Sequence, residues 1–244
     1  AQSSNLVASA RAAAAPSLVA DSLAFQASVL RQLDRIDDAI SVYTNNYVAS
    51  VPEDRRRLAL MNVIELQLAQ GRTAEAGQLL QGLLTQRRDD LSSDIVVLTS
   101  GELQMRLHFD GSGVMPTNLP LAAATNRLEA AMTLFDQVGT NSPLYGKALL
   151  NKGWCLWLEK RVGESVPVLR AAVDALPFSE DLAVARFKLA DAHFAQADYT
   201  NALSGYRALT NEFAGIPRVR ASLFDQALHQ IVRVYIRLGA VEDA

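Results

Sequence analysis

Aromatic and charged side chains alternate along one face of three predicted helices in the second half of the chain. At helical spacing this face comprises Lys147, Asn151, Trp154, Trp157, Phe187, Lys188, Asp191, Phe194 and Arg233. Aromatic rings supply contact area at protein interfaces, while ammonium, guanidinium, amide and carboxylate groups give directed hydrogen bonds. We therefore predict that these residues bind a protein or peptide partner. The sequence leaves one alternative open, in which Trp154 and Trp157 only pack between neighbouring helices.

Residues that carry catalysis or bind metals do not form any known motif in this chain. The histidines His108, His193 and His229 are far apart, and neither H-E-x-x-H nor a Cys/His metal spacing occurs. The segment 110–113 (Asp-Gly-Ser-Gly) lacks the preceding strand and the following Lys-Ser/Thr of a phosphate-binding loop. No G-x-S-x-G nucleophile motif is present. The sequence therefore predicts a non-enzymatic protein with no metal and no cofactor.

Two further groups favour structural roles over chemistry. Cys155 is the single cysteine, so it forms no internal disulfide, and between Trp154 and Leu156 it is predicted to pack in a helix. The run 55–57 is three consecutive arginines, which could bind an anion but which, at the start of a helix, are more typical of an exposed face.

Composition limits the class of protein. The chain has 244 residues, of which 50% are hydrophobic and 20% charged, enough for a large core. Its net charge of −3 predicts no attraction to nucleic acid. No apolar run approaches the roughly 20 residues that a transmembrane helix requires.

A repeated pattern of paired helices must position the predicted binding residues. Each repeat has a small residue in its second helix, and these residues are Ala39, Ala76, Ala131, Ser165 and Ala202. Their separations are 37, 55, 34 and 37 residues. The long interval contains the segment 110–120, with two glycines and two prolines, which we interpret as an insertion loop.

The clearest copy of the pattern runs Leu149, Gly153, Leu156, Ser165, Leu169, Ala172, Pro177. It resembles the tetratricopeptide repeat (TPR) family. The resemblance implies an all-α fold, a right-handed α-solenoid of about five helical hairpins and a truncated sixth, over residues 1–244 as a single domain. It also implies a non-catalytic scaffold that binds a partner on its concave face. Asn151 and Lys188 resemble half of the carboxylate-holding arrangement of chaperone-binding members.

The copy at residues 185–213 is similar to variants in bacterial envelope proteins of the Tol-Pal coordinator and outer-membrane assembly lipoprotein kinds. That similarity favours the periplasm or cell envelope, with the cytoplasm as the alternative. Two other functions remain open at this point. One is an accessory region that positions a separate catalytic or transport domain in a larger envelope protein. The other is a solenoid that binds an envelope glycan or lipid.

The last predicted helix leads to an expectation about the ends of the chain. Leu228, Ile231, Val232, Tyr235 and Leu238 have helical spacing and predict an apolar stripe. Solenoids usually end in a polar-faced capping helix, and none follows in this sequence. We therefore expect a fragment of a longer repeat protein, or self-association through this helix.

Overall fold

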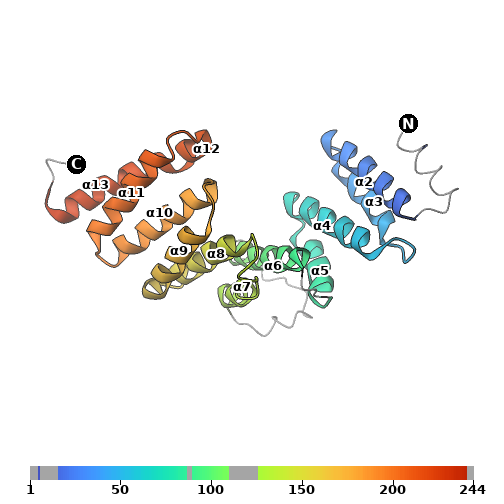
Figure 1. Ribbon diagram of the computed structural model, residues 1–244, viewed down its shortest axis with the longest axis horizontal. Helices are drawn as coiled ribbons and strands as arrows, with labels where there is room; N and C mark the ends of the chain where they lie inside the picture. The colour runs from blue at the N-terminus through green and yellow to red at the C-terminus, as the bar shows by residue number, and fades with distance from the viewer. Residues whose placement is uncertain (1–4, 6–15, 87–89, 110–125, 241–244) are drawn as a thin grey trace. The chain divides into compact units, whose positions relative to one another are not determined.

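The computed structural model describes residues 5, 16–86, 90–109 and 126–240, and these residues form helices and turns without a strand. The predicted insertion at 110–120 lies outside the described residues. The α-helices, labelled in Figure 1, are α2 (Pro16–Gln32), α3 (Ile36–Thr44), α4 (Glu53–Ala69), α5 (Thr73–Leu84), α6 (Leu91–Phe109), α7 (Arg127–Phe135), α8 (Tyr145–Leu158), α9 (Val162–Ala175), α10 (Glu180–Ala195), α11 (Tyr199–Glu212), α12 (Pro217–Val219) and α13 (Asp225–Leu238). Two short elements complete them, the 3₁₀ turn η1 (Asn45–Tyr47) after α3 and the π-helical turn η3 (Arg220–Phe224) before α13.

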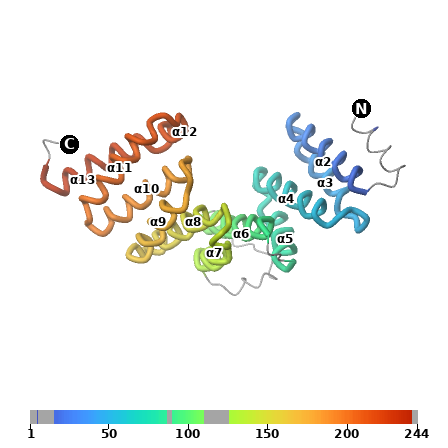
Figure 2. Tube along the Cα trace, in the orientation of Figure 1, coloured from blue at the N-terminus to red at the C-terminus, as the bar shows by residue number. Residues whose placement is uncertain are grey.

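Consecutive helices pack as hairpins: α2 with α3, α4 with α5, α6 with α7, α8 with α9, and α10 with α11 (Figure 2). The predicted all-α class of helical hairpins is confirmed. The chain divides into two compact units. The first unit holds α2 to α5 and the second unit holds α6 to α13.

The same turn geometry ends four first helices, α2, α4, α8 and α10, at equivalent positions. Asp34, Gly71, Lys160 and Ala197 lie in the turns after α2, α4, α8 and α10, with φ of 58°, 75°, 63° and 60°. The backbone N–H of the next residue donates to a carbonyl five residues earlier, at 2.8–2.9 Å. This left-handed residue with a six-to-one hydrogen bond is the Schellman ending of a helix. Gly239, with φ of 74°, gives α13 the same ending, so α13 ends as a first helix does.

The small residues of the second helices lie where the helices of a hairpin cross. Ala39, Ala76, Ala131, Ser165 and Ala202 are all 0% exposed, as the sequence predicts. The Ser165 hydroxyl donates to the carbonyl oxygen of Gly153 on the facing helix α8, at 2.8 Å. Helices that approach this closely leave no room for larger side chains.

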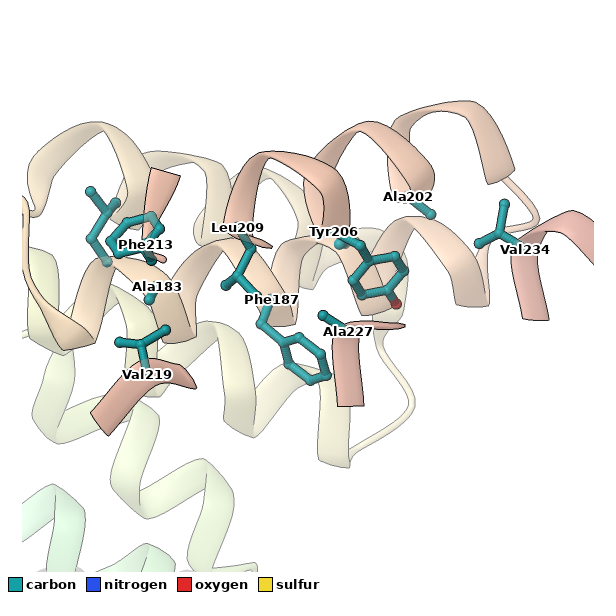
Figure 3. Packing of buried hydrophobic residues seen from close by; sticks show 11 residues of the cluster. Ala183, Phe187, Ala202, Tyr206, Leu209, Phe213, Val219, Ala227 and Val234 are labelled. Carbon is teal, nitrogen blue, oxygen red and sulfur yellow. The ribbon is translucent and has the colours of Figure 1, made fainter. Parts of the chain in front are cut away.

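The hydrophobic core of the last repeats lies between α10, α11 and α13, and Figure 3 shows its side chains. Tyr206, Leu209 and Phe213 of α11 and its C-cap are 0% exposed there. Ala227 and Val234 extend the cluster from α13. In the first unit, a separate cluster is built around Ala27, Ala39, Tyr43 and Val63.

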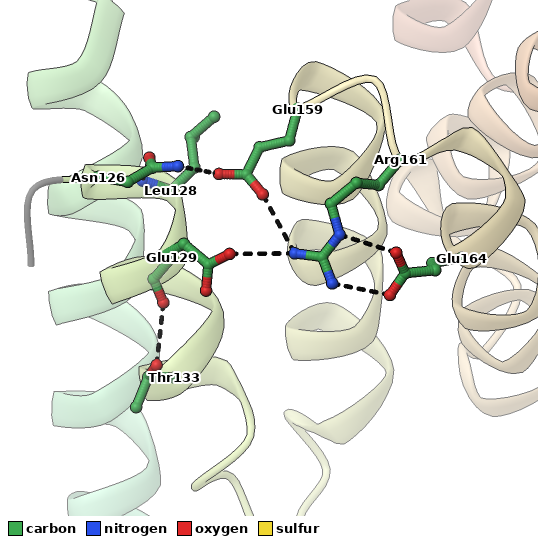
Figure 4. Close-up of polar contacts among 7 residues, drawn as sticks. All are labelled: Asn126, Leu128, Glu129, Thr133, Glu159, Arg161 and Glu164. Carbon is green, nitrogen blue, oxygen red and sulfur yellow. Dashed lines mark hydrogen bonds and ion pairs between the residues drawn. The ribbon is translucent and has the colours of Figure 1, made fainter.

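Polar contacts join the start of α7 to the turn between α8 and α9 (Figure 4). Arg161 lies at the centre, with ion pairs to Glu129 at 3.1 Å, Glu159 at 3.2 Å and Glu164 at 2.7 Å. The amide of Asn126, which caps α7, donates to Glu159. Because several charges share one guanidinium, this network is a stronger link between repeats than an isolated surface pair.

Charged residues one repeat apart also meet on neighbouring helices of the first unit. Three ion pairs join residues 34 or 35 positions apart at 2.6–2.8 Å: Arg55–Asp21, Arg31–Glu65 and Arg72–Asp37. A separation of one repeat therefore places two side chains next to each other. The same rule governs the candidate site in the second unit.

Candidate functional site

The predicted binding residues of α8 share one side of that helix. The Trp154 and Trp157 rings stack on each other with centroids 4.8 Å apart and planes 13° apart. Both side chains are half-buried. Trp157 also packs against the cluster around Leu150, Leu169 and Ala172, so this side chain contributes to packing between helices. The other ring, that of Trp154, meets a side chain of α10.

Lys188 of α10 lies over this aromatic pair. Its ammonium nitrogen is 3.0 Å from the centroid of the Trp154 ring, a cation–π contact between residues 34 positions apart. Among the described residues, no carboxylate forms an ion pair with Lys188. Burial lowers the pKa of its amine to about 8, although the charge of Asp191 opposes this effect. The site therefore holds a partly desolvated, unpaired cation on an aromatic surface.

A second cation lies over a ring on the next first helix. The Arg233 guanidinium of α13 is 4.7 Å from the centroid of the Phe194 ring and donates to the Gln230 amide oxygen at 2.8 Å. Gln230 in turn donates to Asp191 at 3.0 Å, and the Tyr206 hydroxyl donates to the same carboxylate oxygen. Burial raises the pKa of Asp191, and these hydrogen bonds and nearby cations oppose the rise.

Two predicted residues use their polar groups within the chain. Lys147 forms an ion pair with Asp181, which is one repeat further along on α10. The Asn151 amide donates to Glu102 of α6 at 3.0 Å, and burial raises the pKa of this carboxyl group. Asn151 and Lys188 were expected to hold one carboxylate together; the described Asn151 contact is instead to an internal carboxylate.

Phe187 occupies a different place from the one expected. Its side chain is 9% exposed and lies in the core of the last repeats, with its ring 5.7 Å from that of Tyr206. Figure 3 shows the two rings within the same cluster. The inclusion of Phe187 among surface residues is corrected for this reason: the side of α10 that carries it faces α11, whereas the side with Lys188 faces α8.

Sequence reasoning missed Glu102, Asp181 and Gln230, which are the polar neighbours of the site. A signal for Asp181 was present, because it follows Lys147 by 34 residues, the separation at which charges pair elsewhere in the chain. Glu102 carries no comparable signal, because the segment 110–120 lies between it and Asn151. Gln230 follows Asp191 by 39 residues rather than by 34, so the repeat separation gives no signal for this contact.

The last helix presents two apolar faces rather than one stripe. Ile231 packs against the core next to Ala227 and Val234. Leu228, Val232, Ile236 and Leu238 are 40–56% exposed. The predicted stripe therefore combined residues from a buried face and an exposed face.

The other candidates have structural surroundings. Cys155 is fully buried, and burial raises the pKa of its thiol to about 12, which keeps it protonated and unreactive at neutral pH. In the part of the chain that the structure describes, no three His, Cys, Asp or Glu side chains gather as metal ligands. The described helices include none with the length and apolarity to cross a membrane.

Solved structures with a similar fold are tetratricopeptide-repeat proteins. One from Parabacteroides merdae superposes with a TM-score of 0.63 at 12% identity, covering 91% of this chain and 74% of that one. A thermophilic protein from Thermus thermophilus gives 0.58 at 19% identity, covering 86% and 98%. YrrB, described as a TPR protein with an unusual peptide-binding site, gives 0.56 at 12% identity, covering 86% and 90%. At these identities the likeness shows the fold.

Family models provide the assignment. One tetratricopeptide-repeat model matches residues 26–90 and 120–180, which together exceed half of the chain, and a second matches residues 184–215. A search of curated protein sequences finds no significant match. The matched ranges include at least one helix of every hairpin described above, and the chain therefore belongs to the tetratricopeptide-repeat family.

Proposed function

We propose that this chain is a non-catalytic scaffold that binds an acidic peptide segment on the surface formed by α8, α10 and α13 of the second unit. The tetratricopeptide-repeat fold is one of protein-interaction scaffolds, and a structural relative is described as having a peptide-binding site. The choice of an acidic peptide as the ligand, and of this surface as its binding site, depends on the charged side chains of the second unit.

The observation that carries the proposal is the contrast between paired and unpaired cations. Lys147 has a carboxylate partner, whereas Lys188 and Arg233 lie over aromatic rings without one among the described residues. A buried ammonium has lost part of its hydration, and a carboxylate supplied by a partner would restore strong hydrogen bonds. Trp154 and Phe194 add apolar area beside each cation, which suits Asp or Glu residues interspersed with hydrophobic ones.

Neutralising Lys188 is expected to weaken this binding. A fluorescein-labelled peptide rich in Asp, Glu and Leu would be titrated with the chain and followed by fluorescence anisotropy. Lys188→Gln should raise the Kd about tenfold or more, because a hydrogen bond between charged groups contributes about 1.5–3 kcal/mol. Lys152→Gln is the matched control, since Lys152 of α8 is already paired with Asp136. Equal effects of the two substitutions would refute the assignment.

The same titration should depend on pH in a defined direction. With a pKa of about 8, Lys188 is mostly charged at pH 7 and mostly neutral at pH 9, whereas peptide carboxylates are ionised at both. Affinity should therefore fall about tenfold between pH 7 and pH 9. Lys188→Arg keeps its charge throughout this range and should remove the pH dependence. A wild-type affinity that stays constant over this range would contradict a role for the charged amine.

A further inference from the structure

Side chains of neighbouring first helices meet at one repeated position across the second unit. Asn151, Lys188 and Gln230 each lie nine residues before the left-handed residue that ends α8, α10 and α13, respectively. Each of them contacts one residue of the preceding first helix at 3.0 Å, measured to the ring centroid for Lys188. The three contacts are Glu102–Asn151, Trp154–Lys188 and Asp191–Gln230. Together they form one row that crosses α6, α8, α10 and α13.

The contacting residues of the preceding helices are also equivalent to one another. Trp154 and Asp191 lie six residues before the left-handed residue that ends their helix. Glu102 and Trp154 each follow a glycine at which an added Cβ would strike a side chain of the second helix in the same hairpin. The row therefore follows from the stacking of the repeats, and a partner segment in an extended conformation can lie along it.

The unpaired charges along this row change sign from one end to the other. Glu102 is the carboxylate at the α6 end, it remains accessible at the surface, and within the described part of the chain it forms no ion pair. Lys147 of α8 is already paired with Asp181. The cations without a carboxylate partner among the described residues, Lys188 and Arg233, lie on α10 and α13. A purely acidic peptide would leave Glu102 without a counter-charge.

The two carboxylates of the row differ in their hydrogen-bond partners. Asp191 accepts hydrogen bonds from both Tyr206 and Gln230. Glu102 accepts one described hydrogen bond, from the neutral amide of Asn151. Because a hydrogen bond between charged groups is roughly twice as strong as one between neutral groups, Glu102 gains more from a cation that a partner supplies. This difference favours a basic side chain at the α6 end of the row.

We propose that the partner segment is bipolar, with a Lys or Arg beside Glu102 and acidic residues beside Lys188 and Arg233. This inference rests on the proposed function, because it adds a basic contact to the acidic peptide that binds at α10 and α13. The partner class thus narrows from an acidic peptide to one that carries both signs of charge in a fixed order.

The length of the row sets the spacing of these charges in the peptide. Asn151 and Trp154 are three residues apart on α8, so their Cβ atoms lie about 5–6 Å apart. With a contact of 3.0 Å on either side, the charges of Glu102 and Lys188 lie on the order of 10 Å apart. A polyproline II segment has three residues per turn and rises about 3.1 Å per residue. Charges three residues apart in such a segment therefore share one side and match the row.

Peptides with a defined order of charges test this proposal on the whole chain. Fluorescence anisotropy would follow labelled Lys-Pro-Leu-Glu-Pro-Leu-Glu and Glu-Pro-Leu-Glu-Pro-Leu-Lys, each compared with the peptide in which Gln replaces Lys. In one of the two orders, Lys should lower the Kd about three- to fivefold relative to Gln, as expected for an exposed ion pair. An equal gain in both orders, which the net charge of −3 alone would produce, or a gain in neither order overturns the proposal.

Substitutions of Glu102 test the residue itself. Glu102→Gln keeps an oxygen that can accept from Asn151 and should reduce the gain from Lys to about 1.5-fold or less, because the pair loses one charge. Glu102→Lys should reverse the preference, so that Glu binds more tightly than Lys at that peptide position. Asp174→Asn is the matched control, since it removes an exposed carboxylate of α9 outside the row, and should retain the gain. A gain that survives Glu102→Gln refutes the contact.

The same titrations separate this inference from the proposed function. If the Gln peptides bind and Lys188→Gln weakens them, the acidic site is supported independently of any effect of the peptide Lys. Absence of a gain from Lys then overturns the bipolar assignment alone. If none of the peptides binds at millimolar concentration, the proposed function and the bipolar assignment fail together.

Discussion

Replacing Phe213 by alanine is expected to lower the free energy of unfolding of the second unit by about 3–5 kcal/mol. Phe213 is 0% exposed at the end of α11 and belongs to the core between α10, α11 and α13. Its ring stacks on that of Phe178 at 4.7 Å, with the planes 13° apart. Truncation therefore leaves a cavity and removes an aromatic contact at once.

Phe178→Ala is the matched control for this prediction. The substitution breaks the same ring pair, but Phe178 is 63% exposed, so the expected loss is about 1 kcal/mol, in the range of an aromatic pair alone. Urea unfolding followed by tryptophan fluorescence measures both variants. The two tryptophans of the chain, Trp154 and Trp157, lie in the second unit, so the signal reports that unit. Similar losses in the two variants would show that the stack, rather than the burial of Phe213, provides the stabilisation.

Local rules in the sequence predict the hairpins well. The turn after α4 follows from local sequence, because Gly71 adopts the left-handed conformation, for which glycine has no steric penalty. Lys160 and Ala197 adopt the same conformation in equivalent turns without that signal. The burial of Ala76 and Ala202 follows from spacing, because only small residues fit where two helices cross. These features depend on contacts within one repeat, so the sequence of a single repeat is enough to predict them.

The candidate sites depend on contacts between repeats, and here prediction was less complete. Projection onto a helix placed Phe187 and Lys188 together, although they are adjacent residues about 100° apart around α10. One reaches the core and the other reaches Trp154. The repeat separation of 34 residues explains why Lys188 contacts Trp154, which no single helix reveals.

Adding one methyl group at Gly153 is expected to destabilise the second unit. An alanine Cβ at this position would lie 2.6 Å from two side-chain atoms of Leu169 and 3.4 Å from its backbone nitrogen. Leu169 is 0% exposed on α9, so it cannot move aside without disturbing its neighbours. Overpacking of this kind costs about 1–3 kcal/mol. The loss should exceed the gain in helix propensity of up to about 1 kcal/mol that alanine brings over glycine.

Gly163→Ala, in the same hairpin, should stabilise the second unit rather than destabilise it. Gly163 is exposed at the start of α9, and the nearest atom to an added Cβ is 3.7 Å away on Gln196, an ordinary contact. Without a clash, alanine restricts the unfolded chain and should stabilise the unit by about 0.4–1 kcal/mol. Both variants would be compared by urea unfolding with tryptophan fluorescence.

The double variant Gly153→Ala with Leu169→Ala should lose less stability than the sum of the two single changes. The reason is that Leu169→Ala removes the atoms with which the new methyl group collides. Additive losses would mean that the new methyl group and Leu169 do not collide, and that the helices of this hairpin have room to separate.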